Sequence, residues 1–287
     1  MKIAVLSGKG GTGKTLISVN LASVANDSYY IDCDVEEPNG HLFFKPVIEN
    51  KEHVTIKIPS VDNNLCNGCR TCVEFCKFNA LAYIKNNLVI FEEICHSCGG
   101  CAMLCPQKAL IEKNKKVGEI QEGLSKDVKV ITGIMNTGEE TGVSIIKKLL
   151  SRNTDNKKYT FIDCPPGSGC SVMESIKDAD YCLLVAEPTI FGVHNFNMIY
   201  KLVMLMNKPF GAVLNKCFDE DEENPAETFC LNNNMKILGK IPFDNELGEL
   251  NSNGHIAARE NNKYFELFKT LLQEVEKEAQ HETVVNS

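Results

Sequence analysis

Residues 2–15 read KIAVLSGKGGTGKT, and the order of features in this stretch decides the fold. The apolar run at residues 2–7, rich in branched side chains, predicts a buried parallel strand. A glycine-rich loop follows, and a helical pattern begins at residues 16–22. Strand, loop and helix in this order predict a phosphate-binding loop, because glycines let backbone N–H groups converge on phosphates at a helix N-terminus. The alternative is a glycine-rich turn without a ligand.

The loop residues have distinct expected roles. Lys14 is predicted to reach the β- and γ-phosphates of a nucleotide, and the Thr15 hydroxyl to hold Mg²⁺. The residues predicted to bind the nucleotide in this loop are Gly8, Gly10, Gly11, Thr12, Gly13, Lys14 and Thr15.

Lys9, at the second position of the loop, makes this motif resemble the deviant Walker A loop of the MinD, ParA, Mrp and nitrogenase iron-protein ATPases. In that family a lysine here crosses a dimer interface and touches the partner's nucleotide. The resemblance implies ATP and Mg²⁺ as cofactors and catalytic roles for Lys9 and Lys14. It also implies an ATP-dependent dimer, either a homodimer or a heterodimer with a paralogue. The alternative for Lys9 is a solvated surface lysine.

The composition limits the class of protein. A chain of 287 residues can bury a full core, and its net charge of −8 argues against a nucleic-acid partner. No apolar stretch of about 18 residues is present, so no transmembrane helix is expected. The sequence runs directly into a predicted strand, so no signal peptide is expected. Its 14 cysteines therefore indicate metal or redox chemistry in a reducing compartment, and a cytoplasmic location is expected.

Two further strands end in carboxylates, at the sheet edge where open α/β sheets bind their ligands. Residues 28–34 (SYYIDCD) lead into a segment that resembles switch I of the MinD-like ATPases. That resemblance implies that Asp34 positions or polarises the attacking water and that Asp32 supports the Mg²⁺ shell. Residues 159–163 (YTFID) resemble a Walker B strand, which implies that Asp163 holds Mg²⁺ through water. Helix-capping roles are the alternatives for Asp34 and Asp163.

The remaining strands alternate with helical patterns. Strands are expected at residues 54–58, 127–131, 181–186, 210–214 and 235–239, and helices at 142–150 and 194–206. This alternation predicts parallel βαβ units, and hence an α/β fold with a doubly wound, mostly parallel sheet. Asn215 resembles the family's adenine-reading residue, because an amide can pair with a purine edge. Pro242 resembles the family's adenine-packing turn.

Two cysteine runs share the spacing C-x₂-C-x₂-C-x₃-C, and each is followed by an Ala-Leu pair at the same offset. This repeat resembles the bacterial two-cluster ferredoxins, in which the fourth cysteine of each run ligates the other cluster. The resemblance implies one [4Fe-4S] cluster on Cys66, Cys69, Cys72 and Cys105 and a second on Cys95, Cys98, Cys101 and Cys76. Zinc is the alternative, although it favours C-x₂-C pairs. Cys170, outside both runs, is expected to be a packed thiol, and the alternative is a place near a dimer axis in contact with a partner's metal centre.

The whole chain resembles MinD-superfamily P-loop ATPases with an inserted α+β ferredoxin-like domain. The expected domains are 1–58 and 115–287 for the two parts of the ATPase domain and 59–114 for the insert. The resemblance implies an ATP-driven electron carrier that serves a redox acceptor protein. An Mrp-type ATPase that delivers clusters to an iron–sulfur acceptor protein is the alternative. A positioning ATPase is third, and an amidotransferase-type synthase fourth. The acidic segment 263–279 lacks the basic face of a membrane-binding helix, so no membrane contact is expected.

Overall fold

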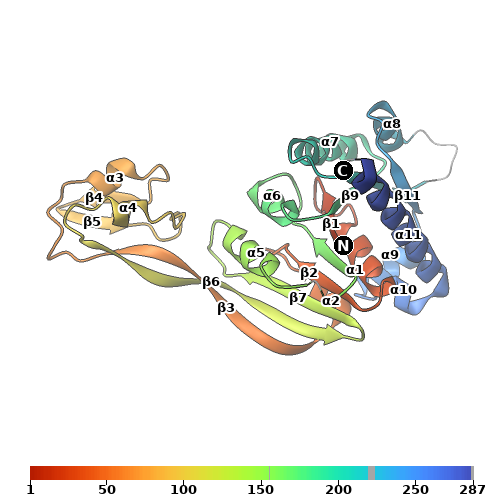
Figure 1. Ribbon diagram of the computed structural model, residues 1–287, viewed down its shortest axis with the longest axis horizontal. Helices are drawn as coiled ribbons and strands as arrows, with labels where there is room; N and C mark the ends of the chain where they lie inside the picture. Colours follow the sequence, from red (N-terminus) through yellow and green to blue (C-terminus); the bar gives the residue numbers. More distant parts are fainter. Residues whose placement is uncertain (155, 219–223, 286–287) are drawn as a thin grey trace.

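The computed structural model describes residues 1–154, 156–218 and 224–285, which form a large sheet with helices on both faces and a smaller unit set apart (Figure 1). Within the described residues the large sheet has nine strands in the order β11-β10-β9-β1-β8-β2-β7-β6-β3. Neighbours from β11 to β7 are parallel, whereas β6 and β3 are antiparallel additions at one edge. The strands are β1 (Lys2–Ser7), β2 (Ser28–Asp32), β3 (Val47–Val61), β6 (Leu110–Ser125), β7 (Val128–Met135), β8 (Tyr159–Asp163), β9 (Tyr181–Ala186), β10 (Phe210–Cys217) and β11 (Ile237–Pro242).

Two hydrophobic layers attach the helices to this sheet. Alternate residues of each strand point to opposite faces, and because both faces are buried, the central strands are apolar throughout. Val5 and Phe161 belong to the layer under α1, α2, α9, α10 and α11, whereas Ile31 and Leu184 belong to the layer under α5–α8. The helices are α1 (Lys14–Val24), α2 (Gly40–Phe44), α5 (Val143–Leu150), α6 (Cys170–Ile176), α7 (Ile190–Leu205), α8 (Pro225–Asn232), α9 (Asn245–Ser252), α10 (Ala257–Glu260) and α11 (Asn262–Val285). The expected doubly wound, mostly parallel sheet is confirmed.

The strands β3 and β6 form a long antiparallel ribbon that extends beyond the sheet (Figure 1). The strand expected at residues 54–58 is the middle part of the longer β3. Both expected domain limits lie within this ribbon, where Pro59 is paired with Glu112 and Lys57 with Asn114. The edge position of β3 explains how a proline fits there, because a residue without an N–H is tolerated on an edge strand.

The ribbon carries the smaller unit, residues 62–109, which we call the cysteine unit. It contains α3 (Thr71–Phe75), the hairpin β4 (Leu81–Ile84) and β5 (Asn87–Ile90), and α4 (Gly100–Met103). The two cysteine runs have matching backbones, with positive φ angles at equivalent positions. These pairs are Gly68 and Ser97 (72° and 53°), Arg70 and Gly99 (61° and 70°), and Asn79 and Lys108 (56° and 51°). The sequence repeat is thus also a repeat of conformation.

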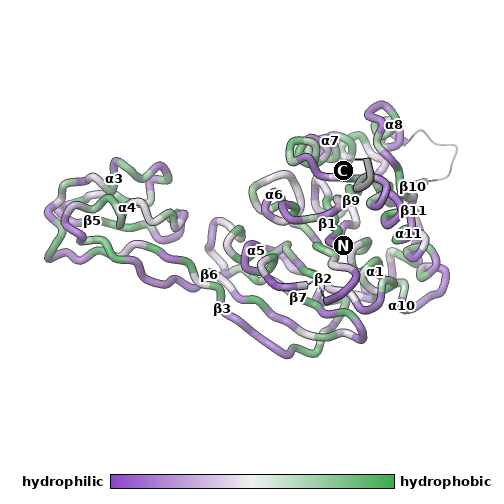
Figure 2. The backbone as a smooth tube through the Cα atoms, viewed as in Figure 1, coloured by the Kyte–Doolittle hydropathy of each residue, from purple (hydrophilic) through white to green (hydrophobic). Residues whose placement is uncertain are grey.

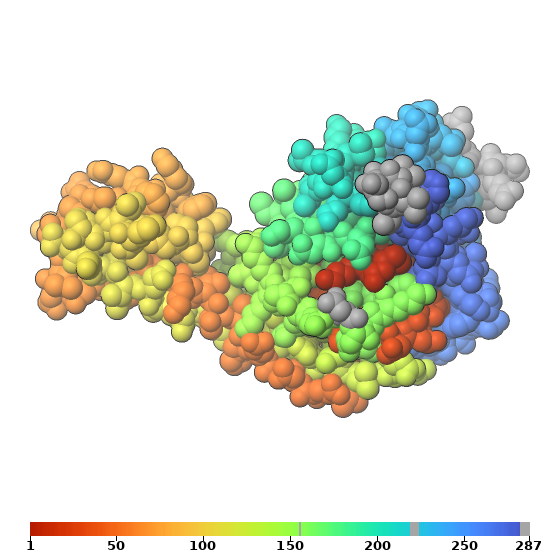
Figure 3. Space-filling model, in the orientation of Figure 1, coloured from red at the N-terminus to blue at the C-terminus, as the bar shows by residue number. Residues whose placement is uncertain are grey.

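The core of the cysteine unit is small. Hydrophilic and hydrophobic stretches mix along the ribbon and the unit (Figure 2), and the unit stands out from the main body in a space-filling view (Figure 3). Its buried cluster consists of Cys72, Leu81, Leu88 and Cys101, together with Leu110 at the adjoining end of β6. Two of these five are predicted cluster ligands, and a core of this size normally needs a metal or a cross-link to be stable.

No helix in the described ranges is both long and apolar enough to cross a lipid bilayer. The longest, α11, packs Phe268 and Val275 against the sheet. The helical segment expected at residues 263–279 lies within it.

Replacement of Gly40 by alanine tests how closely α2 packs against Tyr30 of β2. An added Cβ would lie 2.2 Å from the Tyr30 ring, and Tyr30 is fully buried. We expect Gly40→Ala to lower the free energy of unfolding by about 1–3 kcal/mol, as overpacking usually does. The control is Gly248→Ala in α9, where, apart from its chain neighbours and its own helix backbone, no described atom lies within 4 Å of the new Cβ. Alanine there should raise stability by about 0.5–1 kcal/mol. Urea denaturation measures both, and equal stability of the two variants would contradict this packing.

Candidate functional site

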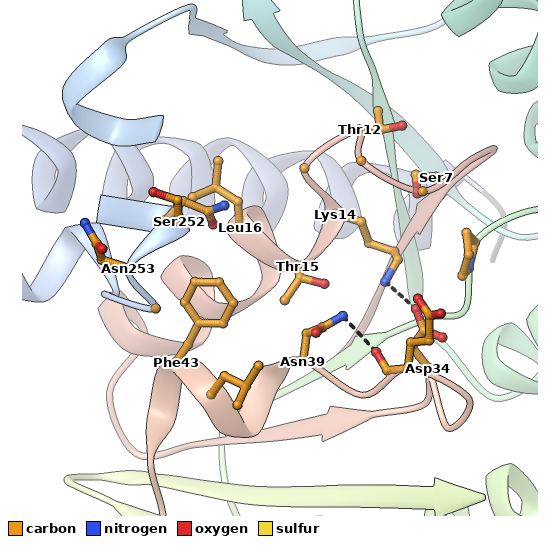
Figure 4. Close-up of a pocket in the computed structure, with 18 residues that line it drawn as sticks. Ser7, Thr12, Lys14, Thr15, Leu16, Asp34, Asn39, Phe43, Ser252 and Asn253 are labelled. Carbon is orange, nitrogen blue, oxygen red and sulfur yellow. Dashed lines mark hydrogen bonds and ion pairs between the residues drawn. The ribbon is translucent and has the colours of Figure 1, made fainter. Parts of the chain in front are cut away.

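A pocket of about 680 Å³ lies at the carboxyl ends of β1, β2 and β8, where the glycine-rich loop meets α1 (Figure 4). Thr15 and Asn39 lie in its middle, with Lys14 and Asp34 at one end and Phe43 and Asn253 at the other (Figure 4). Its lining consists of Ser7, Gly10, Gly11, Thr12, Gly13, Lys14, Thr15, Leu16, Asp34, Glu37, Asn39, Leu42, Phe43, Pro166 and residues 251–254. Most of the predicted loop residues therefore line one cavity.

Backbone conformation explains the glycines of the loop. Gly11 and Gly13 have φ angles of 76° and 98°, which side chains with a Cβ rarely adopt. A Cβ on Gly13 would also meet the Asn215 amide at 2.0 Å. The Ser7 and Thr12 hydroxyls both donate to the Lys9 carbonyl, at 2.9 and 3.1 Å, and so fix the curve of the loop.

Lys14, the first residue of α1, has a buried ammonium group between carboxylates. Its Nζ donates to Asp163 Oδ1 at 2.7 Å and lies 3.8 Å from Asp34 Oδ2. Burial alone would lower the pKa of Lys14, but the Asp163 and Asp34 carboxylates outweigh it, and the pKa is raised. The ammonium therefore stays charged at the point where phosphates are expected.

The carboxylates around Lys14 are more numerous than its charge can balance. Asp32 accepts from the backbone N–H groups of Gly40 (2.9 Å) and Asp34 (3.2 Å). Burial, then the nearby Asp163 charge, raises the pKa of Asp32 to about 8. Burial likewise raises the pKa of Asp34 to about 6, with Asp163 adding to the effect. A bound cation would offset the repulsion between these carboxylates and stabilise their charged forms. Mg²⁺ is normally bound by one or two carboxylates together with the phosphates of a nucleotide, so these residues fit Mg²⁺ bound with a nucleotide.

Lys9 is paired within its own chain, with the Glu187 carboxylate. Glu187 also lies 3.5 Å from Lys216, whose ammonium donates to the Gly11 carbonyl at 2.7 Å. Burial disfavours the charged form of Glu187, but the two lysines outweigh it and lower its pKa. This carboxylate connects the end of β9 with the loop.

Asn215 and Pro242 do not line the pocket. The Asn215 amide, 2% exposed, donates to the Thr12 carbonyl at 2.8 Å and thereby supports the loop from β10. Pro242 ends β11 and is paired with Cys217. Their expected contacts with adenine stay a prediction.

The sequence did not indicate two polar residues of this site. The buried Tyr30 hydroxyl donates to Asp163 Oδ2 at 2.8 Å and holds the side of that carboxylate away from Lys14. Tyr30 lies inside an apolar strand, so no local pattern points to it. Glu187 follows β9 directly. A carboxylate at the end of a strand is the signal that identified Asp34 and Asp163, so the same signal could have pointed to Glu187. Cys170 was expected to be packed but is exposed, because it begins α6 directly after the loop at residues 165–169.

The eight cysteines of the two runs lie in two groups. Cys66, Cys69, Cys72 and Cys105 line one small cavity. In the other group, Cys95 is close enough to Cys76 and Cys98, and Cys101 to Cys95 and Cys98, for their charges to interact. Cys105 therefore lies with the first three cysteines of the first run, and Cys76 lies beside Cys95 of the second run.

The fourth cysteines of the two runs accept equivalent backbone hydrogen bonds. The Cys76 sulfur accepts from the backbone N–H of Ala80 at 3.4 Å, and the Cys105 sulfur accepts from that of Ala109 at 3.3 Å. Burial raises the pKa of Cys101 to about 11, and the neighbouring thiols add to the effect. Among the residues that the structure describes, no three His, Cys, Asp or Glu side chains are grouped to hold a single metal ion.

Residues 3–257 match the family described as CbiA, the CobQ/CobB/MinD/ParA nucleotide binding domain, and the chain belongs to this family. Two uncharacterized proteins of Methanocaldococcus jannaschii are similar to it. One is 31% identical over 96% of each chain, and the other is 32% identical over 75% of this chain and 80% of its own. The iron-sulfur cluster carrier protein of the same organism is 22% identical over 88% of this chain and 76% of its own.

The fold is that of the MinD-like P-loop ATPases. The cell division ATPase MinD of Pyrococcus furiosus has a TM-score of 0.61 with this chain, at 19% identity over 96% of this chain and 98% of its own. MinD of Pyrococcus horikoshii, solved with Mg-ADP, has a TM-score of 0.60 at 18% identity over 96% of each chain. The expected class, a nucleotide-binding P-loop ATPase, is confirmed.

The raised pKa of Asp34 predicts a pH-dependent effect on stability. The folded protein binds this proton more tightly than the unfolded chain, so the free energy of unfolding falls as pH rises from about 4 to about 6. Asp34→Asn removes this loss. Without nucleotide and Mg²⁺, we expect the variant to gain about 1–2 kcal/mol over wild type across that range, because partial exposure reduces the full effect.

Urea denaturation at several pH values measures this difference. Asp178→Asn, which removes an exposed carboxylate, is the control. Parallel curves for wild type and Asp34→Asn would contradict the raised pKa.

Proposed function

We propose that this chain binds and hydrolyses MgATP and couples its nucleotide state to electron transfer by two [4Fe-4S] clusters in the cysteine unit. The observation that carries the proposal is the grouping of the thiols, with Cys105 beside the first three cysteines of the first run and Cys76 beside Cys95 of the second. This arrangement is attached by one ribbon to a P-loop ATPase body.

The pocket supports the following roles in ATP hydrolysis. The N–H groups of residues 10–15 bind the phosphates, and Lys14 turns from Asp163 toward the β- and γ-phosphates. Thr15, with Asp163 and Asp32 behind it, holds Mg²⁺. Asp34 orients the attacking water. We also propose that the adenine lies against Asn215 and Pro242, although neither residue lines the pocket in this structure.

Lys9 has its role in a dimer. We propose that ATP brings two copies of the chain, or this chain and a paralogue, together, and that Lys9 exchanges Glu187 for the phosphates of the partner subunit's nucleotide. Lys9 is the more accessible member of the present pair, since its side chain is 36% exposed and that of Glu187 only 11%. This exposure supports the exchange, because the lysine can leave without uncovering the core.

The cysteine unit fits the proposed clusters. An iron–sulfur cube is wider than one metal ion, so its four thiols lie farther apart than the ligands of zinc. The absence of a single-ion site among the described residues is therefore compatible with the proposal. Backbone N–H groups already point at Cys76 and Cys105, and such bonds stabilise thiolates. When bound, each cluster would accept and release one electron at a time.

A delivery ATPase is the second candidate. The similarity to an iron-sulfur cluster carrier protein favours it. Against it, each proposed cluster has four cysteine ligands from its own chain, of which Cys72 and Cys101 are buried while Cys69 and Cys98 are exposed. Four ligands from one chain favour retention of a cluster, whereas a cluster bridged between two chains is more easily transferred. A redox acceptor protein is therefore the partner that we propose.

The role of Lys9 is tested by replacing it with alanine. Lys9→Ala should bind ATP as wild type does, because the other loop contacts stay, but hydrolysis should fall about a hundredfold or more, in the range found for loss of one charged group at a transition state. Lys14→Ala, the control, should abolish hydrolysis altogether. Phosphate release and nucleotide titration measure the two effects. Wild-type turnover by Lys9→Ala would contradict a role across a dimer.

The clusters are tested on anaerobically purified protein. About eight irons per chain are expected, and EPR of the reduced protein should change when MgATP is added. Cys72→Ser should lower the iron content by about half, since each cluster has its own ligands. Cys170→Ser, outside the cysteine unit, is the matched control and should leave it unchanged. If iron instead passes to an apo-acceptor while ATP is consumed, the delivery function replaces electron transfer.

A further inference from the structure

The point at which the ribbon leaves the sheet lies beside the residues that surround ATP. Strand β6 pairs with β7 from Ser125 to Gly118, and beyond Gly118 it pairs with β3 alone (Figure 1). At this point the Asn136 N–H donates to the Val117 carbonyl at 2.9 Å, and its side-chain amide donates to the Lys116 carbonyl at 3.0 Å. The loop after β7 therefore holds the base of the ribbon.

The same loop is attached to the segment that contains Asp34. The Val35 carbonyl accepts from the Met135 N–H at 2.8 Å. The Val35 side chain is 2% exposed and is enclosed by Gly133 and Gly142, where an added Cβ would lie 2.7 and 2.1 Å from it. Because these glycines lie on either side of the loop at residues 136–141, a displacement of Val35 must displace that loop.

The loop at residues 136–141 is connected to the cysteine unit through Lys115. Glu139 donates its N–H to the Asn136 carbonyl at 3.3 Å and pairs with Lys115, on β6, at 2.9 Å. The Lys115 ammonium also donates to the carbonyl of Glu92, at 3.3 Å, in the loop that leads to Cys95. The side chains of Lys115 and Glu139 are only 16% and 12% exposed, so solvent weakens this pair less than an ordinary surface pair.

We propose that Lys115 is a positioning residue that joins the nucleotide site to the cysteine unit. A change at Asp34 moves Val35 and the loop at residues 136–141, and the pair of Glu139 with Lys115 passes the movement to Glu92 and the Cys95 side of the unit. This inference rests on the proposed function, because it supplies the path by which ATP acts on the clusters. A chain of contacts alone does not establish coupling, so the test measures coupling directly.

The chain contains a matched control for Lys115. Lys113 lies on the same strand and pairs with the Glu92 carboxylate at 2.6 Å, but its side chain is 49% exposed. It thus touches the same residue of the cysteine unit as Lys115. Within the described ranges, no hydrogen bond or ion pair joins Lys113 to the loop at residues 136–141.

The experiment is hydrogen exchange of residues 88–98 in the full-length holoprotein, with and without a non-hydrolysable ATP analogue and Mg²⁺. In wild type the analogue should slow exchange there about fivefold, the lower end of usual couplings between two sites. Lys115→Met and Glu139→Gln should each lose this difference, and the double variant should lose no more than either one. Lys113→Met should keep it, and Lys115→Arg should restore most of it. The midpoint potential of the clusters should follow the same order in its response to nucleotide.

Nucleotide binding is measured separately by titration on the same samples. If wild type binds the analogue but exchange at residues 88–98 does not change, the role of Lys115 is overturned while the proposed ATPase function stands. The role is also overturned if Lys115→Met responds like wild type, or if Lys113→Met loses the response as well. If wild type does not bind the analogue, the proposed function fails, and the coupling fails with it. Glu139→Gln keeps the test decisive should Lys115→Met not fold.

Discussion

The charge of Lys14 is the constraint on which the nucleotide site depends. A buried ammonium needs nearby anions, and Asp163 supplies the closest one at 2.7 Å. The two residues come from α1 and β8, which are distant in sequence, so their pairing fixes where the glycine loop lies on the sheet. Tyr30 holds the other oxygen of Asp163, which leaves that carboxylate one orientation. In this structure the Lys14 ammonium is bonded to Asp163 and not to a phosphate. Nucleotide binding must therefore rearrange the pair of Lys14 with Asp163.

A second constraint explains the position of the cysteine unit. The parallel strands are enclosed on both faces, so an insertion among them would disturb buried packing. The antiparallel pair β6 and β3 extends the sheet at its edge instead, and only the far end of this pair carries the unit. The unit therefore needs a source of stability of its own, and because its buried core cluster is small, the proposed clusters are the natural one.

The sequence predicted those parts of the fold that have a local cause. The glycine loop, the strands that end in Asp32 and Asp163, and the helix at residues 142–150, observed as α5, follow from short patterns. The full length of β3 does not, because residues 47–53 (VIENKEH) are mostly exposed on both faces and show no alternation. Tyr30 and Asn215 were not identifiable as supports of Asp163 and the loop, since each acts through a partner far away in sequence. Long-range hydrogen bonds leave no local pattern.

The geometry also limits how nucleotide and clusters can influence each other. The cysteine unit lies at the end of a ribbon, away from the loop that binds phosphate (Figure 1). A ribbon two strands wide can tilt at the point where β6 leaves β7, near Gly118. Without a further contact, such a tilt would be independent of ATP. In the coupling that we propose, the partly buried pair of Lys115 with Glu139 restrains this tilt, and the hydrogen bond of the same loop to Val35 makes the restraint depend on the nucleotide site. Because electron transfer falls steeply with distance, control of the unit's orientation would be sufficient to control the electron transfer that we propose.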